Sequence, residues 1–379
     1  MTRPRGTSLE LAGLLVAVAL AAGLLAWGAR SGRAGESGAR TLWPAGNGAL
    51  VVWRSGVGPL TARFTSAGGK MTESSLGAGS DVQLIAGAPR PVLLVTDPDG
   101  GHRLLRLSAG GRWSTIAAAL SPSDLTTAAL SRGLVYLPVG MGDRAAVLAT
   151  DAAGRVVARL PLPVLEPDPS TLVTAPGATI EPARRGRGRV RALLVAGGDV
   201  LAVTSTGQAA AVTDLRTRET ASLSSYTRVV AATVGGDGFI YLLAGRSDPA
   251  FTLRFLRVTV HPLRVLWAWD TDTGPGREPV TALPTGSGAV FYAPGADASL
   301  ATASDTDLWL IDAAGARRDG AVPSGLGLRM GPGSADSVLL YGGSSDAAVT
   351  RFDTDDGARS RAGARLRAPA GASVLLAAD

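Results

Sequence analysis

Beyond residue 48 the chain alternates between short apolar runs and clusters of turn residues. The runs are roughly four to eight residues long, which is the length of β-strands, and Gly, Asp and Pro separate them. No segment in this region keeps the 3.6-residue period of an amphipathic helix. The pattern therefore predicts an all-β fold.

One hairpin motif recurs along the chain. It consists of a small, glycine-rich turn that often ends in a basic residue, and its clearest copies are TSAGGK (65–70), LSAGGR (107–112), TDAAGR (150–155) and IDAAGAR (311–317). Looser copies lie at 213–219, 260–264 and 352–359. A repeat of roughly 40–50 residues that contains four strands is typical of propeller blades.

Two further strands precede each hairpin. We expect innermost strands at 81–87, 125–131, 190–197, 228–234, 279–284 and 327–331, and strongly apolar second strands at 49–55, 91–96, 133–139, 199–205, 239–245, 289–294 and 337–342. The first repeat lacks an innermost strand, and residues 372–379 can supply it, which removes an open sheet edge. The sequence thus predicts a seven-bladed β-propeller closed three plus one.

This organisation resembles the seven-bladed β-propeller superfamily. TDAAGR and IDAAGAR are similar to the Asp–small–small–Gly turns of quinoprotein-like and WD-like repeats, and the resemblance covers residues 48–379. It concerns the fold only, because Trp269-Asp270 is a single Trp-Asp pair at a strand end and the tryptophan docking motif of quinoprotein dehydrogenases is missing. We accordingly expect no cofactor.

An uncharged apolar run, Leu11 to Ala29, precedes the repeats. Its nineteen residues would form a helix of about 28 Å, close to the thickness of a bilayer core. We expect a cytoplasmic N-tail (1–10), a transmembrane anchor (11–29), a tether (30–48) and an extracytoplasmic propeller (49–379). A cleaved signal peptide is the alternative, although its apolar region is usually only about 7–15 residues long.

Composition restricts the chemistry. With no Cys and two His, one chain cannot form a thiolate zinc site or a three-His metal site, and both His102 and His261 are expected to be exposed turn residues. The Asp-rich segments 97–101, 270–274, 304–308 and 353–357 fit hairpin turns better than calcium loops, so we expect no metal. The net charge of +6 is spread along the chain, and we expect no nucleic-acid partner.

Long connectors give the clearest functional hint. Segments 161–189, 245–252, 271–278 and 294–306 should share one face of the propeller, and long loops on a rigid scaffold are where binding sites concentrate. The RRGRGR run within 184–189 could hold a phosphate, an anionic lipid headgroup or an acidic wall polymer; the alternative is a solvated loop. The candidate binding residues are Arg184, Arg185, Arg187, Arg189, Asp248, Asp272, Arg277, Glu278, Asp297 and Asp305.

Two classes of function remain open from the sequence. We expect a membrane-tethered, non-enzymatic binding or scaffold domain whose partner is a protein or a cell-envelope component. The alternative is an envelope carbohydrate hydrolase or lyase, which requires two or more convergent carboxylates in the central funnel. A quinone-dependent oxidoreductase has the least support, and the residues indicate no catalytic group.

Overall fold

A computed structural model describes most of the repeat region. The described residues are 49–54, 58–65, 71–79, 81–85, 92–108, 112–120, 127–140, 144–151, 155–167, 185–223, 225–246, 252–271, 281–293, 305–323, 329–332, 337–341, 348–354, 359–365 and 373–377. The chain divides into two compact units, Met1–Ser37 and Gly38–Asp379, and the described residues all belong to the second. Among them no helix is long and apolar enough to cross a membrane, and the proposed anchor 11–29 lies outside them.

The described strands form seven four-stranded antiparallel sheets, in agreement with the all-β expectation. From the innermost strand outward, the first four are β30 (Ser373–Ala377), β1 (Ala49–Arg54), β2 (Leu60–Thr65) and β3 (Met71–Gly77); β4 (Asp81–Leu84), β5 (Val92–Thr96), β6 (His102–Leu107) and β7 (Trp113–Leu120); β8 (Ala129–Ser131), β9 (Leu134–Val139), β10 (Ala146–Thr150) and β11 (Val156–Pro161); β14 (Arg189–Ala196), β15 (Asp199–Ser205), β16 (Ala210–Asp214) and β17 (Thr220–Ser222).

The remaining three sheets continue the same order. They are β18 (Arg228–Val234), β19 (Ile240–Gly245), β20 (Leu253–Thr259) and β21 (Arg264–Asp270); β22 (Thr281–Pro284), β23 (Gly288–Ala293), β24 (Asp305–Asp312) and β25 (Gly315–Pro323); β26 (Arg329–Pro332), β27 (Ser337–Tyr341), β28 (Ala348–Asp353) and β29 (Arg359–Arg365). A separate two-stranded ribbon joins β12 (Val164–Leu165) to β13 (Gly186–Arg187).

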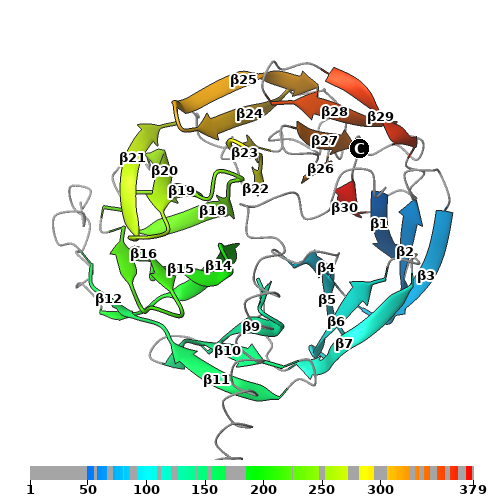
Figure 1. Ribbon diagram of the computed structural model, residues 1–379, viewed down its shortest axis with the longest axis horizontal. Helices are drawn as coiled ribbons and strands as arrows, with labels where there is room; N and C mark the ends of the chain where they lie inside the picture. Colours follow the sequence, from blue (N-terminus) through cyan, green and yellow to red (C-terminus); the bar gives the residue numbers. More distant parts are fainter. Residues whose placement is uncertain are drawn as a thin grey trace, which may run out of the picture. The chain divides into compact units, whose positions relative to one another are not determined.

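The sheets follow one another around a centre in chain order, with their first strands inside (Figure 1). The C-terminal strand β30 pairs antiparallel with β1, so that Ala377 faces Ala49 and Leu376 faces Leu50. This is the pairing expected for residues 372–379, and it gives the first sheet its innermost strand. The arrangement fits a β-propeller.

The hydrophobic core lies between neighbouring sheets rather than within any one of them. On β15, Leu201 and Val203 pack towards the β18–β21 sheet, whereas Val200 and Ala202 pack towards the β8–β11 sheet. All seven residues of β15 are buried as a result. Successive side chains of a strand point to opposite faces, so a strand covered on both faces must be apolar at every position. This explains why the second strands are continuous apolar runs in the sequence.

Strand direction distinguishes two faces of the ring of sheets. We call one the short-turn face; it carries the turns between the first and second and between the third and fourth strands of each sheet, such as Gly197–Gly198 and residues 215–219. The other is the connector face; it carries the turns between second and third strands and the links between sheets. The strands that bracket segments 161–189, 245–252, 271–278 and 294–306 place the ends of all four on the connector face, as expected.

Candidate functional site

The described candidate binding residues lie on the connector face. Arg187 belongs to β13, Arg189 begins β14, and Arg185 immediately precedes β13. Arg185 and Arg189 are exposed, and Asp305 is the first residue of β24. The other members of the predicted set, Arg184, Asp248, Asp272, Arg277, Glu278 and Asp297, lie outside the described residues.

The segment 161–189 differs from a plain loop at both of its ends. β12 pairs with β13 through Val164–Arg187 and Leu165–Gly186, and β14 begins one residue earlier than expected, at Arg189. Arg185 lies 3.5 Å from Glu166, measured from Nε to Oε1, and both side chains are largely exposed. Such an exposed pair contributes little to stability.

The densest cluster of ionisable groups, however, lies on the short-turn face. Asp199 begins β15, directly after a two-residue turn in which Gly197 and Gly198 both have positive φ (56° and 82°). A tight hairpin of this type needs the left-handed conformation at both central positions, which glycine adopts without strain. The turn thereby fixes where the Asp199 carboxylate leaves the backbone.

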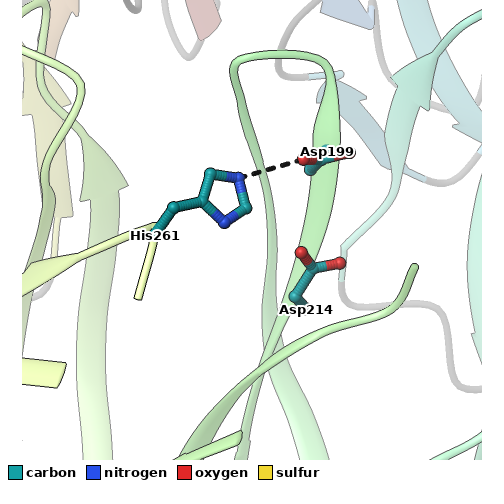
Figure 2. Close-up of side chains that lie close together, drawn as sticks. All are labelled: Asp199, Asp214 and His261. Atoms are coloured by element: carbon teal, nitrogen blue, oxygen red, sulfur yellow. Dashed lines mark hydrogen bonds and ion pairs between the residues drawn. The ribbon is translucent and has the colours of Figure 1, made fainter. Parts of the chain in front are cut away.

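Three sheets contribute cations or an imidazole to Asp199. Arg216 Nε and Nη2 donate to its two oxygens at 2.6 and 2.9 Å, and Arg132 Nη2 lies 3.4 Å from Oδ1. His261, in the turn between β20 and β21, reaches across from the next sheet and places Nε2 3.1 Å from Oδ2 (Figure 2). The carboxylate is 5% exposed, and hydrogen bonds from Arg216 hold the pKa of Asp199 below its ordinary value although burial opposes them. Asp199 therefore remains ionised at neutral pH.

Asp214 completes the cluster from the end of β16. Its Oδ1 accepts the backbone N–H groups of Arg216 and Thr217 at 2.7 and 3.1 Å, which fixes the turn that carries Arg216. The residue is fully buried, and its Oδ2 has no hydrogen-bond partner within the part of the chain that the structure describes. The Asp that ends the third strand has the same turn-capping role at Asp151 and Asp312. The repeated TDAAGR and IDAAGAR motifs are therefore hairpin turns, as the sequence predicts.

The cluster has two conceivable chemical uses. One ligand atom each from Asp199, Asp214 and His261 lie within 4.8 Å of one another, a spacing that a divalent cation could bridge. A cation there would have to displace Arg216, which already neutralises Asp199 through two short bonds. An imidazole oriented by a carboxylate is also a general-base arrangement, but the arginine pair weakens the pull of this carboxylate on the ring. The geometry thus favours an ion-pair network that joins sheets.

The histidine expectations need correction. His102 lies in β6 and is 2% exposed, with Nδ1 3.2 Å from Thr96 Oγ1, so the prediction of an exposed turn residue is wrong for it. The cause is register, because the DPDGG turn ends at Gly101 and the next residue already belongs to the strand. His261 is a half-exposed turn residue as expected, but sequence spacing gave no sign that a residue 62 positions earlier would be its partner.

A second buried polar group lies on the β18–β21 sheet. Tyr241 donates its hydroxyl to Asp237 Oδ2 at 2.6 Å, and Arg257 Nη2 lies 3.0 Å from the same oxygen. The guanidinium of Arg257 also stacks 3.7 Å from the centre of the Phe239 ring. These contacts fix the turn between β18 and β19 and offer no free group to a ligand.

Comparisons with known proteins bear on the fold. No protein-family model matches the sequence, and no curated protein matches it. Among solved structures, the chain is similar to a putative 6-phosphogluconolactonase from Bacteroides fragilis NCTC 9343, at 10% identity and a TM-score of 0.54 over 87% of this chain and 97% of that one. A putative 6-phosphogluconolactonase from Bacteroides uniformis ATCC 8492 gives 11% identity and a TM-score of 0.53 over 86% and 99%.

The tricorn protease is a further similar structure. It matches at 12% identity and a TM-score of 0.50, over 89% of this chain but only 35% of that longer one. At such identities a likeness concerns the backbone arrangement and carries no activity with it. The chain is therefore an all-β protein of several four-stranded sheets with propeller-like structural neighbours.

Proposed function

We propose that the chain is a seven-bladed β-propeller, closed three plus one, that acts as a non-enzymatic binding or scaffold domain. Its partner is a protein or a cell-envelope component. Residues 11–29 hold it at the membrane with the propeller outside the cytoplasm. The seven sheets and the β1–β30 pairing support the blade count and the closure.

The observation that carries the binding role is the different use of charge on the two faces. On the short-turn face, charged groups bind one another across sheets: Asp199 with Arg132, Arg216 and His261, and Glu219 with the backbone N–H of Leu263 at 2.7 Å. On the connector face, Arg187, Arg189 and Arg191 have no carboxylate partner among the described residues. Groups that the fold already uses are poor ligand contacts, whereas the connector-face arginines remain available.

The position of the chain ends agrees with this assignment. Ala49 and Ala377 face each other at the short-turn end of β1 and β30. The tether therefore joins the propeller on the short-turn face, and its attachment does not obstruct the connector face.

The hydrolase or lyase alternative needs two carboxylates that meet in the funnel with separate protonation states. The carboxylates that the described residues bring together, Asp199 and Asp214, lie on the short-turn face, and Asp199 is held ionised by Arg216. This geometry does not favour the alternative.

Affinity capture with cross-linking tests the proposal. The full chain is expressed in its own cells, and its cross-linked envelope partners are compared with those of two charge-matched variants. The connector-face variant carries Arg185→Ser, Arg187→Ser and Arg189→Ser. The control carries Arg106→Ser, Arg112→Ser and Arg264→Ser, which removes the same charge from exposed positions elsewhere.

We expect the wild type and the control to capture the same component and the connector-face variant to lose it. Surface changes of this kind should alter the free energy of unfolding by no more than about 0.5 kcal/mol. Equal capture by all three proteins would place the binding surface elsewhere. Hydrolysis of envelope glycan by the purified protein would replace the scaffold role with the enzymatic one.

A further inference from the structure

The backbone between β13 and β14 lies tightly against the end of β15. Gly188 is buried, and a Cβ atom there would lie 2.9 Å from the backbone nitrogen of Ser205 and 3.0 Å from Leu165 Cδ1. Arg189 then faces Ser205 in the β14–β15 register. Only glycine permits this approach, so Arg187 and Arg189 are held on either side of Ser205 by rigid backbone.

A third arginine converges on the same serine. The β14–β15 register shifts between Val190 and Ala192, which leaves Arg191 as a bulged residue. Its Nε donates to Ser205 Oγ at 2.8 Å, and Ser205 is itself buried. Bulges often re-aim a side chain at functional sites. The bond through Nε restrains the guanidinium without using its two terminal nitrogens.

The charge around Ser205 is not balanced within the described residues. Partial burial and the nearby charge of Arg189 both lower the pKa of Arg191, whereas no carboxylate acts on it. Glu166 is the described acid of this region, and it contacts Arg185 instead. Partly buried charges are normally compensated by a counter-charge, so this site is electrostatically ready for an anion.

We propose that Arg187, Arg189 and Arg191, arranged around Ser205, bind a phosphate or phosphodiester group on the connector face. The proposal rests on the proposed function and specifies the chemistry of its ligand. Guanidinium groups form paired N–H···O bonds whose spacing matches phosphate oxygens, and they keep their charge at any physiological pH. Because Ser205 restrains Arg191 beforehand, binding loses less side-chain entropy there.

Nucleic acid fits this site poorly, although it also carries phosphodiesters. Residues 185–191 contain no aromatic side chain on which a base could stack. The same phosphate chemistry can come from a soluble phosphate polymer or from a lipid headgroup, and the experiment separates these two sources.

Binding is measured with the full chain in neutral detergent. The first probe is short-chain inorganic polyphosphate, followed by calorimetry. The second is a phosphatidylcholine vesicle with or without phosphatidylglycerol, followed by co-flotation. The variants are Arg187→Ser/Arg189→Ser/Arg191→Ser, the single Arg191→Lys, the single Ser205→Ala and the control Arg106→Ser/Arg112→Ser/Arg264→Ser.

We expect the triple variant to weaken binding by about tenfold or more, as the loss of charge-assisted hydrogen bonds implies. Arg191→Lys keeps the charge but loses the planar fork, and Ser205→Ala keeps the charge but frees the guanidinium, so both should weaken binding less than the triple variant but measurably. The control should bind like the wild type, and binding should fall as salt rises. Polyphosphate binding alone identifies a soluble ligand, and flotation only with phosphatidylglycerol identifies a lipid headgroup.

Equal binding by the wild type and the triple variant overturns the proposal, as does an unchanged affinity in both single variants. If the triple variant unfolds, the two single variants decide. Should the wild type bind neither probe and yet capture an envelope partner through the connector face, this inference fails while the proposed function stands. Loss of both results refutes both.

Discussion

Replacement of Tyr241 by Phe isolates one buried hydrogen bond of the β18–β21 sheet. The side chain is fully buried on β19, and its hydroxyl donates to Asp237 Oδ2 at 2.6 Å. Asp237 also accepts Arg257 Nη2 at 3.0 Å and the backbone N–H of Phe239 at 3.2 Å. The change removes the hydroxyl and leaves the ring, so no cavity larger than one oxygen atom is created.

The magnitude follows from what stays behind. A hydrogen bond to a charged group contributes about 1.5–3 kcal/mol, and the lower end applies here because Asp237 keeps its two other donors. We expect a loss of about 1.5 kcal/mol in the free energy of unfolding. Asp237→Asn should lose more, about 3–5 kcal/mol, because it leaves the Arg257 charge, with its side chain 11% exposed, without a counter-ion.

The contribution of Tyr241 should also depend on pH. Burial raises the pKa of Tyr241 well above its ordinary value, and the hydrogen bond to Asp237 adds to the effect. A group whose pKa is raised in the folded state stabilises the fold fully below the unfolded-state pKa, near 10, and loses that contribution as the pH rises further. The difference between wild type and Tyr241→Phe should therefore be constant at neutral pH and shrink above about pH 10.

Urea unfolding of the full chain in detergent measures these values. Tyr136→Phe is the matched control, because Tyr136 is half-buried on β9 and no described residue bonds its hydroxyl; its change should stay within about 0.5 kcal/mol. The reasoning is refuted if Tyr241→Phe is no more destabilising than Tyr136→Phe. It is also refuted if Asp237→Asn is the milder of the two changes at the Asp237 network.

Three further outcomes are expected. Deletion of residues 372–379 should lower the unfolding midpoint of the whole ring, because β1 loses its partner and an apolar edge opens; an unchanged midpoint would contradict the closure. Asp199→Asn should destabilise the fold at neutral pH but much less below about pH 4, since a carboxylate with a depressed pKa stabilises only above its unfolded-state pKa, and acid titration of unfolding checks this. Residues 11–29 should remain on the mature protein in the membrane fraction, and a soluble form that begins near Arg30 on N-terminal sequencing would replace the anchor with a cleaved signal.

The sequence by itself determined the strands and their order. Each repeat carries an innermost strand, an apolar second strand and a hairpin that ends in a small, glycine-rich turn, and the observed bounds differ from the expected ones mostly at the ends. Local physics suffices for this, because period-2 alternation, strands buried on both faces and turn residues all act over a few positions. It also indicated that residues 372–379 would pair near the N-terminus, since one strand was left over at each end.

Tertiary structure alone decided which polar groups meet. His261 and Asp199 are 62 residues apart and belong to different sheets, and Arg132 reaches Asp199 from a third. The bulge at Arg191 and the packing of Gly188 against Ser205 likewise follow from how β13 and β14 lie on β15. Neither is encoded in spacing along the chain, because a contact between sheets depends on the twist and register of whole strands. The sequence thus indicated the arginine-rich connector, and the fold showed where its arginines converge.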